Sequence, residues 1–383
     1  MTRTAGWRLP DGTFPLLWQG SLFDPSGYSE ETRCVLYACE SQGLRVAARA
    51  WPTFAETIEL GAVQRATLER ALGRAEPATP YVEVLHKTIP PASRATLYPD
   101  TGPTVLRTMF ETDALPAGWA AIVARFDRVW VPGAFNVETF ANAGVPAAKL
   151  RVLPQTLDFS TLLAPAAPLE LPAAARGTRF LSVFEFSERK GWRRLLDAWA
   201  DAFGPGDDVS LVLKSSNLVM GVTDARRRID AHLAARRAAP IVLIEDCLSQ
   251  ADMARLYRAC DAFVLPSRGE GWGRPFMEAM ACGLPTIGPD WGGSRAFMSA
   301  ESAFLVAGEV VPIAPGDLVF ERYVGQRWFD PDRDELAAAL RTVAAGGADV
   351  AARAARGASE IAERFSHERF VARLEQLVAE ALA

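Results

Sequence analysis

The sequence predicts an α/β protein with two doubly wound, parallel-sheet domains. The chain has 383 residues, which is long for one hydrophobic core and comfortable for two. Short apolar segments alternate with helical segments in both halves, as is typical of parallel sheets covered by helices. Residues 161–178 are rich in Pro and Ala and poor in charge, as in a domain linker. We therefore predict domains at 1–160 and 179–367.

Composition is compatible with a soluble globular enzyme and argues against several other classes. Apolar residues make up 49 % of the chain and charged residues 23 %, which is ordinary for such a protein. The net charge of −5 argues against a general nucleic-acid binder. The five cysteines are odd in number and widely spaced, which favours free thiols in a reducing compartment. Three histidines are too few for a histidine metal cluster, so no metal site is expected.

The hydropathy pattern predicts a cytoplasmic protein. No apolar run approaches the roughly 18 residues that a membrane-spanning helix needs. The first residues, MTRTAGWRLPDG, lack the apolar core of a secretory signal. Peripheral contact with a membrane stays open as an alternative, although no basic amphipathic helix is evident. The oligomeric state is not predicted.

In the first half, three residues stand where ligands bind open parallel sheets. We expect strands at 14–20, 44–47, 81–86, 104–113, 129–132 and 152–155, with helices at 29–41 and 134–143. Gly27 lies in the loop after the first strand, where a missing side chain lets a ligand approach the backbone. His86 and Glu111 fall at the carboxyl ends of two predicted strands, the edge where such sheets bind ligands. The alternative for each is an ordinary loop residue.

In the second half, three cations stand near strand ends. We expect strands at 180–184, 209–214, 241–244, 262–265 and 286–287, helices at 193–203 and 250–259, and helical structure over 332–383. Arg189 and Lys190 follow the first of these strands, and Lys214 ends the second. Such cations can neutralise a diphosphate directly. The alternative for Arg189 and Lys190 is a solvated loop pair, whereas a lysine that ends an apolar strand is oddly placed unless it meets an anion.

The most informative stretch runs from Pro266 to Pro285. An apolar strand precedes it, and three glycines within five residues are followed by Pro275, which suits the first turn of a helix. A glycine-rich loop before a helix N-terminus binds anions, because backbone N–H groups and the helix dipole point at it. The alternative is a surface turn before an ordinary helix.

Two carboxylates frame this loop. Glu270 lies in it, and Glu278 follows eight residues later, about one turn into the helix. Carboxylates are poor partners for phosphate and good acceptors for sugar hydroxyls. Glycines for a diphosphate together with acids for hydroxyls suggest a nucleotide-sugar.

The segment PSRGEGWGRPFMEAMACGLP resembles the E-x7-E motif of the retaining family-4 glycosyltransferases, with Glu270 and Glu278 as the two acids. This resemblance implies the GT-B fold, in which two Rossmann-like domains face each other across a cleft. It implies that the second domain binds the nucleotide-sugar donor and the first mostly binds the acceptor. It also implies that a final helix, from about residue 368 to 383, returns to complete the first domain.

The resemblance further implies an activity. A hexosyl group would pass from a nucleotide-diphosphate sugar to an acceptor hydroxyl with retention of configuration, in the synthesis of a polysaccharide, another glycoconjugate or a natural product. The leaving phosphate would help to deprotonate the acceptor, and no metal or cofactor would take part. The donor base, the sugar, the linkage and the acceptor are not identified by the sequence.

Donor-binding roles follow from the same resemblance. Glu278 would bind the nucleotide ribose and Glu270 the donor sugar, and Lys190 matches the E-K-G lysine that binds donor phosphate. The family's usual arginine upstream of that lysine is absent, and Arg189 and Lys214 resemble a variant set. The remaining expected donor contacts are Gly27 and the backbone amides of Gly271, Trp272 and Gly273.

Catalytic candidates are Glu270, Glu111 and His86. Many family members carry a histidine at the end of the strand that matches 104–111, where this sequence has an acid, Glu111. Two other functions stay open. One is a related GT-B enzyme, such as a phosphorylase or an epimerase, and the other is a nucleotide-sugar binding protein without transfer.

Overall fold

The computed structural model describes residues 9, 12–51, 57–89, 103–216, 224–317 and 321–383. The N-terminal residues, in which the sequence predicts no secretory signal, lie largely outside the described part. The chain divides into two compact units. Unit 1 comprises Met1–Phe110, Ala114–Asp158 and Arg364–Ala383, and unit 2 comprises Glu111–Asp113 and Phe159–Glu363.

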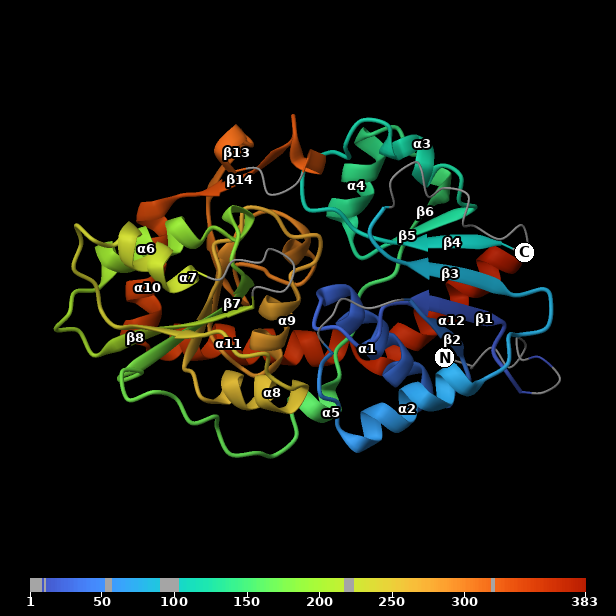
Figure 1. Ribbon diagram of the computed structural model, residues 1–383, viewed down its shortest axis with the longest axis horizontal. Coiled ribbons are helices and arrows are strands. Elements are labelled where there is room, and N and C mark those ends of the chain that lie inside the picture. Colours follow the sequence, from blue (N-terminus) through green and yellow to red (C-terminus); the bar gives the residue numbers. More distant parts are fainter. Residues whose placement is uncertain (1–8, 10–11, 52–56, 90–102, 217–223, 318–320) are drawn as a thin grey trace. The chain divides into compact units, whose positions relative to one another are not determined.

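Unit 1 is built on a six-stranded parallel sheet (Figure 1). Its strands, in spatial order, are β2 (Ala47–Ala50), β1 (Leu16–Gly20), β3 (Val82–His86), β4 (Thr104–Arg107), β5 (Arg128–Val131) and β6 (Leu150–Val152). Its helices are α1 (Gly27–Ser41), α2 (Ala62–Gly73), α3 (Trp119–Val123), α4 (Ala134–Asn142) and α12 (His367–Leu382). Parallel strands joined by helices bury both faces of the sheet, which explains why the strands are nearly continuous apolar runs.

The C-terminal helix α12 belongs to unit 1. Its residues Phe370, Val371 and Leu374 join one hydrophobic core with Trp18 of β1 and Val84 of β3. Figure 1 shows α12, in red, beside the strands of this unit. The apolar positions recur at the three- and four-residue spacing of a helix that buries one stripe.

Unit 2 contains a second six-stranded parallel sheet. Its strands, in spatial order, are β12 (Phe304–Val306), β11 (Thr286–Pro289), β10 (Ala262–Val264), β7 (Thr178–Glu185), β8 (Val209–Ser216) and β9 (Ile241–Ile244). The helices are α5 (Phe159–Leu162), α6 (Trp192–Ala202), α7 (Ala225–His232), α8 (Gln250–Arg258), α9 (Arg274–Ala281), α10 (Arg333–Ala345) and α11 (Ala348–Arg364). An antiparallel pair, β13 (Gly308–Pro312) and β14 (Arg327–Pro331), follows the sheet.

Four expected elements differ from the structure. The strand expected at 44–47 is β2 at Ala47–Ala50, because these residues are the ones in register with Leu17–Gly20 of β1. The strand expected at 104–113 ends at Arg107, since the backbone N–H of Phe110 donates to the side chain of Asn136 at 2.7 Å instead of extending the ladder. The strand expected at 152–155 is β6 at Leu150–Val152, and the linker expected at 161–178 begins inside α5.

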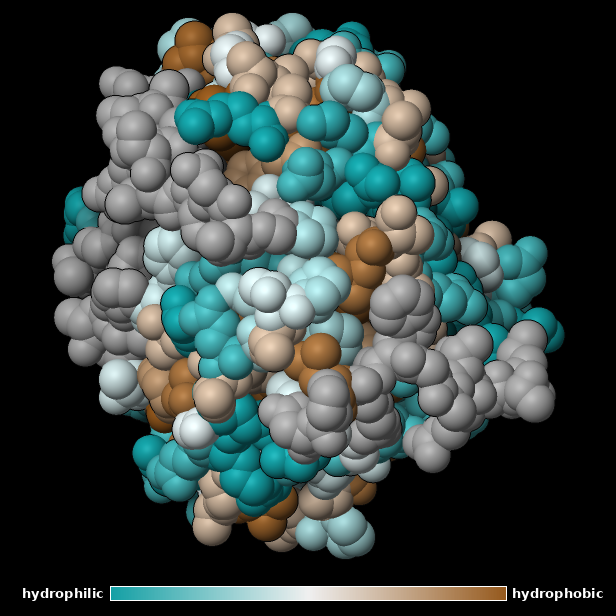
Figure 2. All heavy atoms as spheres, turned by 90° about the vertical axis from the view of Figure 1, so that its right-hand side faces the viewer, coloured by the Kyte–Doolittle hydropathy of each residue, from teal (hydrophilic) through white to brown (hydrophobic). Residues whose placement is uncertain are grey.

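Among the described residues on the face shown in Figure 2, hydrophobic side chains are scattered between hydrophilic ones and form no single large patch. Such scattering is normal for a protein surface. Among the described helices, none is both long enough and apolar enough to cross a membrane.

Leu374→Ala tests the contribution of α12 to unit 1. Leu374 is fully buried in the core of that unit, so we expect a loss of about 2–5 kcal/mol in the free energy of unfolding. Urea denaturation followed by circular dichroism measures the change. Gln376→Ala, an exposed position on the same helix, is the matched control. Equal stability of the two variants would contradict the packing described here.

Candidate functional site

The stretch that begins at Pro266 forms the predicted strand, loop and helix. β10 ends at Val264, and α9 begins at Arg274, with Pro275 in its first turn. Gly273, the residue before the helix, has φ +92°, a left-handed conformation that glycine adopts at little cost. Glu270 is only 8 % exposed, so the alternative of a surface turn with solvated glutamates is wrong for this residue.

Glu270 is bound by the turn that follows β7. Lys190, in the 3-10 turn Glu188–Lys190, donates from Nζ to Oε1 of Glu270 at 2.5 Å. Ser267 Oγ donates to the same oxygen at 2.7 Å, and Arg189 Nη1 lies 3.7 Å from it. Both partners of the ion pair are buried, since Lys190 is 9 % exposed. The structure thus brings together three of the residues expected to bind the donor.

The charge state of Glu270 follows from these contacts. Burial alone would raise the pKa of the Glu270 carboxyl, but the charges of Lys190 and Arg189 and the hydrogen bonds from Lys190 and Ser267 lower it below its usual value. Burial and the neighbouring charge of Arg189 lower the pKa of Lys190. The negative charge of Glu270 acts in the opposite direction but does not cancel this shift. Glu270 is therefore an ionised hydrogen-bond acceptor at neutral pH and unsuited to act as a general acid.

Backbone contacts hold the same loops together. The N–H of Arg268 donates to the carbonyl of Arg189 at 2.7 Å, and Arg189 Nη1 donates to the carbonyl of Gly269 at 2.5 Å. The N–H of Gly293, in the loop after β11, donates to the carbonyl of Glu270 at 2.8 Å. Because β11, β10 and β7 are neighbours in the sheet, three loops from adjacent strand ends meet at Glu270.

Glu278 lies on α9 in a second polar cluster. Its Oε2 accepts a hydrogen bond from the hydroxyl of Tyr257 at 2.8 Å, and its Oε1 lies 3.5 Å from Nη2 of Arg274. Its side chain is 18 % exposed. Trp272 is buried, and its indole N–H points at the sulfur of Met277, 3.3 Å away. The indole therefore packs into unit 2, and the expected contact of the Trp272 backbone amide with a donor stays a prediction.

Lys214 lies on β8, the strand that pairs with β7. It is 5 % exposed on β8, and burial lowers its pKa, while Cys247, Asp246 and Glu245 after β9 oppose that shift. Within the described residues, the structure records no hydrogen bond or ion pair of Lys214 with Lys190 or Glu270. Its expected role as a second phosphate-binding lysine stays a prediction.

The candidates in the first half of the chain lie in two different units. Gly27 begins α1, and a side chain added there would meet nothing within 4 Å. His86 ends β3 in unit 1 and is 1 % exposed. Glu111 groups with unit 2, where the hydroxyl of Tyr323 donates to its Oε2 at 3.2 Å.

His86 is part of a buried polar network in unit 1. Its Nδ1 lies 2.8 Å from the hydroxyl of Thr32, and its Nε2 lies 3.2 Å from Oε2 of Glu31. Arg107 Nε donates to Glu31 at 2.7 Å, and Gln155 Nε2 donates to it at the same distance. Burial alone would raise the pKa of Glu31, but the charges of Arg107 and His86 lower it to about 2.

Several of these partners are not evident from the sequence alone. The contact of Arg274 could have been predicted, because it precedes Glu278 by four residues on a predicted helix. Side chains at this spacing are neighbours on the helix surface, and opposite charges attract there. Glu31 and Arg107 were less predictable. Each is a charged residue within a helix or strand whose other residues are buried. Tyr257 and Tyr323 gave no local signal, because their contacts come from distant segments.

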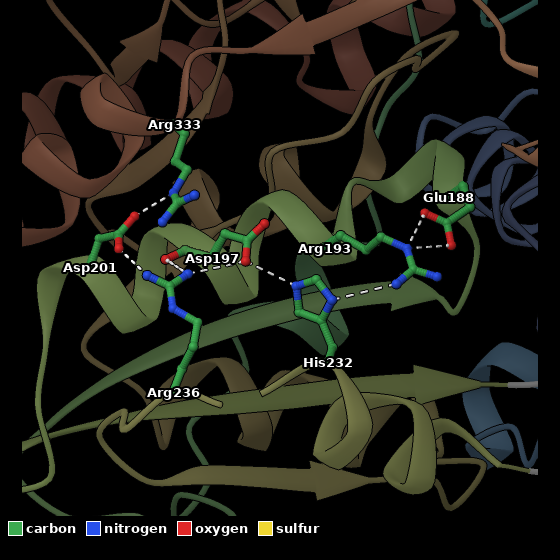
Figure 3. A network of polar contacts seen from close by, with 7 residues as sticks. All are labelled: Glu188, Arg193, Asp197, Asp201, His232, Arg236 and Arg333. Carbon is green, nitrogen blue, oxygen red and sulfur yellow. Dashed lines mark hydrogen bonds and ion pairs between the residues drawn. The ribbon is translucent and has the colours of Figure 1, made fainter. Parts of the chain in front are cut away.

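A network of ion pairs on unit 2 flanks the Lys190 turn (Figure 3). It links that turn to α6, α7 and the start of α10 through Glu188, Arg193, Asp197, Asp201, His232, Arg236 and Arg333. Next to it lies a cavity of about 380 Å³, lined by Trp192, Arg193, Arg228, Ala231 and His232. None of the residues expected to bind a donor lines this cavity. The network instead connects α6, the helix that follows Lys190, to the neighbouring helices α7 and α10.

Comparison with known proteins shows which family a part of the chain resembles. Residues 177–317 match the family model described as glycosyl transferases group 1, a segment that includes Lys190, Glu270 and Glu278. The two six-stranded parallel sheets with their helices match glycosyltransferase structures of the GT-B fold, so the predicted fold is confirmed.

Individual relatives cover different parts of the chain. The D-inositol 3-phosphate glycosyltransferase of Saccharomonospora viridis is 33 % identical over 132 residues, and that of Frankia alni is 43 % identical over 60 residues. These matches span 26 % and 15 % of the two relatives. The structure of Anabaena HepE in complex with UDP-glucose is similar over 95 % of this chain and 99 % of that chain, with a TM-score of 0.67 and 15 % identity. Sucrose-phosphate synthase from Thermosynechococcus elongatus is similar over 96 % and 98 %, with a TM-score of 0.62 and 17 % identity.

Gly191→Ala tests the contact between the Lys190 turn and the glutamate loop. Gly191 has φ +67°, and a Cβ there would lie 2.0 Å from the carbonyl oxygen of Pro266. We expect a loss of at least about 1–2 kcal/mol of stability from the left-handed conformation alone, and more from the clash. Thermal unfolding measures it. Gly206→Ala, where a Cβ meets nothing within 4 Å, is the control. A Gly191→Ala protein as stable as the control would refute the close approach.

Glu31→Gln tests the buried network of unit 1. A carboxyl whose folded pKa is about 2, below its usual value of 4.5, stabilises the fold above pH 4.5, and this stabilisation is lost as the pH falls toward 2. It amounts to about 3 kcal/mol. The variant should be less stable at pH 7 and lose less stability than the parent protein between pH 5 and pH 3.

Urea denaturation across that pH range measures the effect. Glu69→Gln, an exposed position on α2, should leave the pH profile of the parent protein unchanged. Parallel pH profiles for the parent protein and Glu31→Gln would show that Glu31 is not held ionised by its neighbours.

Proposed function

We propose that this protein is a retaining glycosyltransferase that moves a sugar from a nucleotide-diphosphate sugar to an acceptor hydroxyl. The observation that carries the proposal is the buried ion pair between Lys190 and Glu270, in the loop that leads into α9. The match of residues 177–317 to group 1 glycosyltransferases covers all of these residues and supports it.

The diphosphate of the donor would bind at Lys190 and at the N-terminus of α9. A helix N-terminus carries a partial positive charge and favours anions. Lys190 supplies a full positive charge, with Arg189 beside it. Charge that grows on the leaving diphosphate would be stabilised by these groups, whose positions are fixed by hydrogen bonds before the reaction begins.

The sugar and the ribose would bind the two carboxylates. Glu270 stays ionised, as its lowered pKa indicates, and would accept hydrogen bonds from hydroxyls of the transferred sugar. Glu278 would accept hydrogen bonds from the ribose. The structure of Anabaena HepE in complex with UDP-glucose supports a uridine diphosphate sugar as the first donor to test.

The finer parts of the proposal are retention of configuration, transfer of a hexosyl group, and catalysis without a metal or cofactor. Glu111 and His86 stay candidates for catalytic roles near the acceptor. Of the two, Glu111 is the stronger, because His86 is enclosed by Thr32 and Glu31 in the core of unit 1.

Donor turnover tests the function directly. The protein is incubated with UDP-, GDP-, ADP- and dTDP-sugars, with and without candidate acceptors, and free nucleotide is measured. Release of nucleotide with formation of an α-configured product from an α-configured donor supports the proposal. Tight nucleotide binding without release from any donor would indicate a binding protein, and phosphate-dependent formation of a sugar phosphate would indicate a phosphorylase.

Glu278→Ala and Glu270→Gln should separate the two carboxylates. Glu278→Ala should weaken nucleotide binding by about 1–3 kcal/mol, since ribose hydroxyls lose their acceptor. Glu270→Gln should lower turnover and leave the affinity for the free nucleotide nearly unchanged. Isothermal titration calorimetry and steady-state kinetics measure the two quantities. Glu309→Ala, an exposed position in unit 2, is the control, and unchanged nucleotide affinity in Glu278→Ala would refute the site.

A further inference from the structure

Tyr257 reaches Glu278 from a neighbouring helix. It lies on α8, its side chain is fully buried, and its hydroxyl donates to Oε2 of Glu278 at 2.8 Å. The carbonyl of Pro275 is a more distant second acceptor, at 3.5 Å. A phenol hydroxyl has one proton to donate, and the shorter contact with the charged acceptor takes it.

The hydroxyl of Tyr257 remains protonated, and so a donor, at neutral pH. Burial raises the pKa of Tyr257 well above its usual value, and the negative charge of Glu278 raises it further. The phenol therefore stays protonated and cannot become a second anion beside Glu278.

The carboxylate of Glu278 is held on both oxygens. Tyr257 binds Oε2, and Arg274, on the same helix, lies 3.5 Å from Oε1. A glutamate side chain otherwise loses much rotational freedom when it binds a ligand, and this loss weakens binding. In this protein the Glu278 side chain has already lost this rotational freedom before a ligand binds. It is nevertheless 18 % exposed, so a ligand can reach it. A carboxylate has about four lone-pair positions, so a contact on each oxygen does not exhaust it.

We propose that Tyr257 is a positioning residue that fixes Glu278 to accept the hydroxyls of a ribose. The inference rests on the proposed function of Glu278. It adds that the site selects ribonucleoside diphosphates over their 2′-deoxy forms, and that this selection depends on the hydroxyl of a tyrosine that does not touch the ligand. A fixed carboxylate discriminates between a diol and a single hydroxyl because it cannot turn to compensate for the missing group.

Tyr257→Phe tests this inference, because it removes only the hydroxyl. The readout is the ratio of affinities for UDP and 2′-deoxy-UDP, measured by calorimetry on the full chain. The parent protein should prefer UDP, and Tyr257→Phe should reduce the preference by about threefold to tenfold, with little change in the affinity for 2′-deoxy-UDP. A purely structural hydroxyl would lower stability without changing this ratio.

Two further variants keep the test decisive. Tyr81→Phe removes another buried tyrosine hydroxyl that donates to a glutamate, Glu76, in unit 1, and should leave the ratio unchanged. Tyr257→Met also removes the hydroxyl and keeps a large apolar side chain, so it should reduce the preference for UDP in the same way. It serves as the test if Tyr257→Phe does not fold.

The outcomes distinguish the inference from the function on which it rests. If Glu278→Ala reduces the preference for UDP but Tyr257→Phe and Tyr257→Met do not, the positioning role is wrong and the donor site stands. A parent protein that binds UDP and 2′-deoxy-UDP equally well would also overturn the inference. If Glu278→Ala changes neither the affinity for UDP nor the ratio, the proposed donor site itself is wrong.

Discussion

The ion pair between Lys190 and Glu270 joins loops that follow two neighbouring strands, β7 and β10. Each partner is buried, and a buried charge without a partner would be costly, so neither loop can move away alone. The close approach of Gly191 to Pro266 and the hydrogen bond between the backbones of Arg268 and Arg189 depend on the same contact between the loops. The start of α9, and with it Glu278, is therefore fixed relative to Lys190.

Much of the fold and part of the site could be predicted from the sequence. The alternation of apolar strands and helices gave the two parallel sheets, because parallel strands are buried on both faces and read as continuous apolar runs. The loop around Glu270 was predictable for a local reason, since the glycines, the proline and the strand that precedes them are contiguous. Lys190 was predictable because it follows a strand end at the same edge of the sheet.

What could not be predicted depends on contacts between distant segments. Tyr257 looks like any aromatic residue on the apolar face of a helix, and only the packing of α8 beside α9 gives its hydroxyl a role. The early end of β4 is due to Asn136, whose side chain takes the N–H of Phe110 from a position 26 residues later. The burial of His86 follows from Glu31 and Arg107, whose charges compensate each other only in the folded state.

The two carboxylates of the E-x7-E segment differ in the way their charge is held, and this difference supports separate roles. Glu270 is bound by a lysine and by Ser267, so its charge is already balanced and a bound diphosphate would compete with it for Lys190. Glu278 is held by a neutral phenol and by an arginine at 3.5 Å. If Lys190 binds the leaving diphosphate as proposed, Glu270 would respond to the charge that moves during transfer, whereas Glu278 would bind the nucleotide uniformly. On the proposed function, Glu270 would therefore act mainly on turnover and Glu278 mainly on affinity.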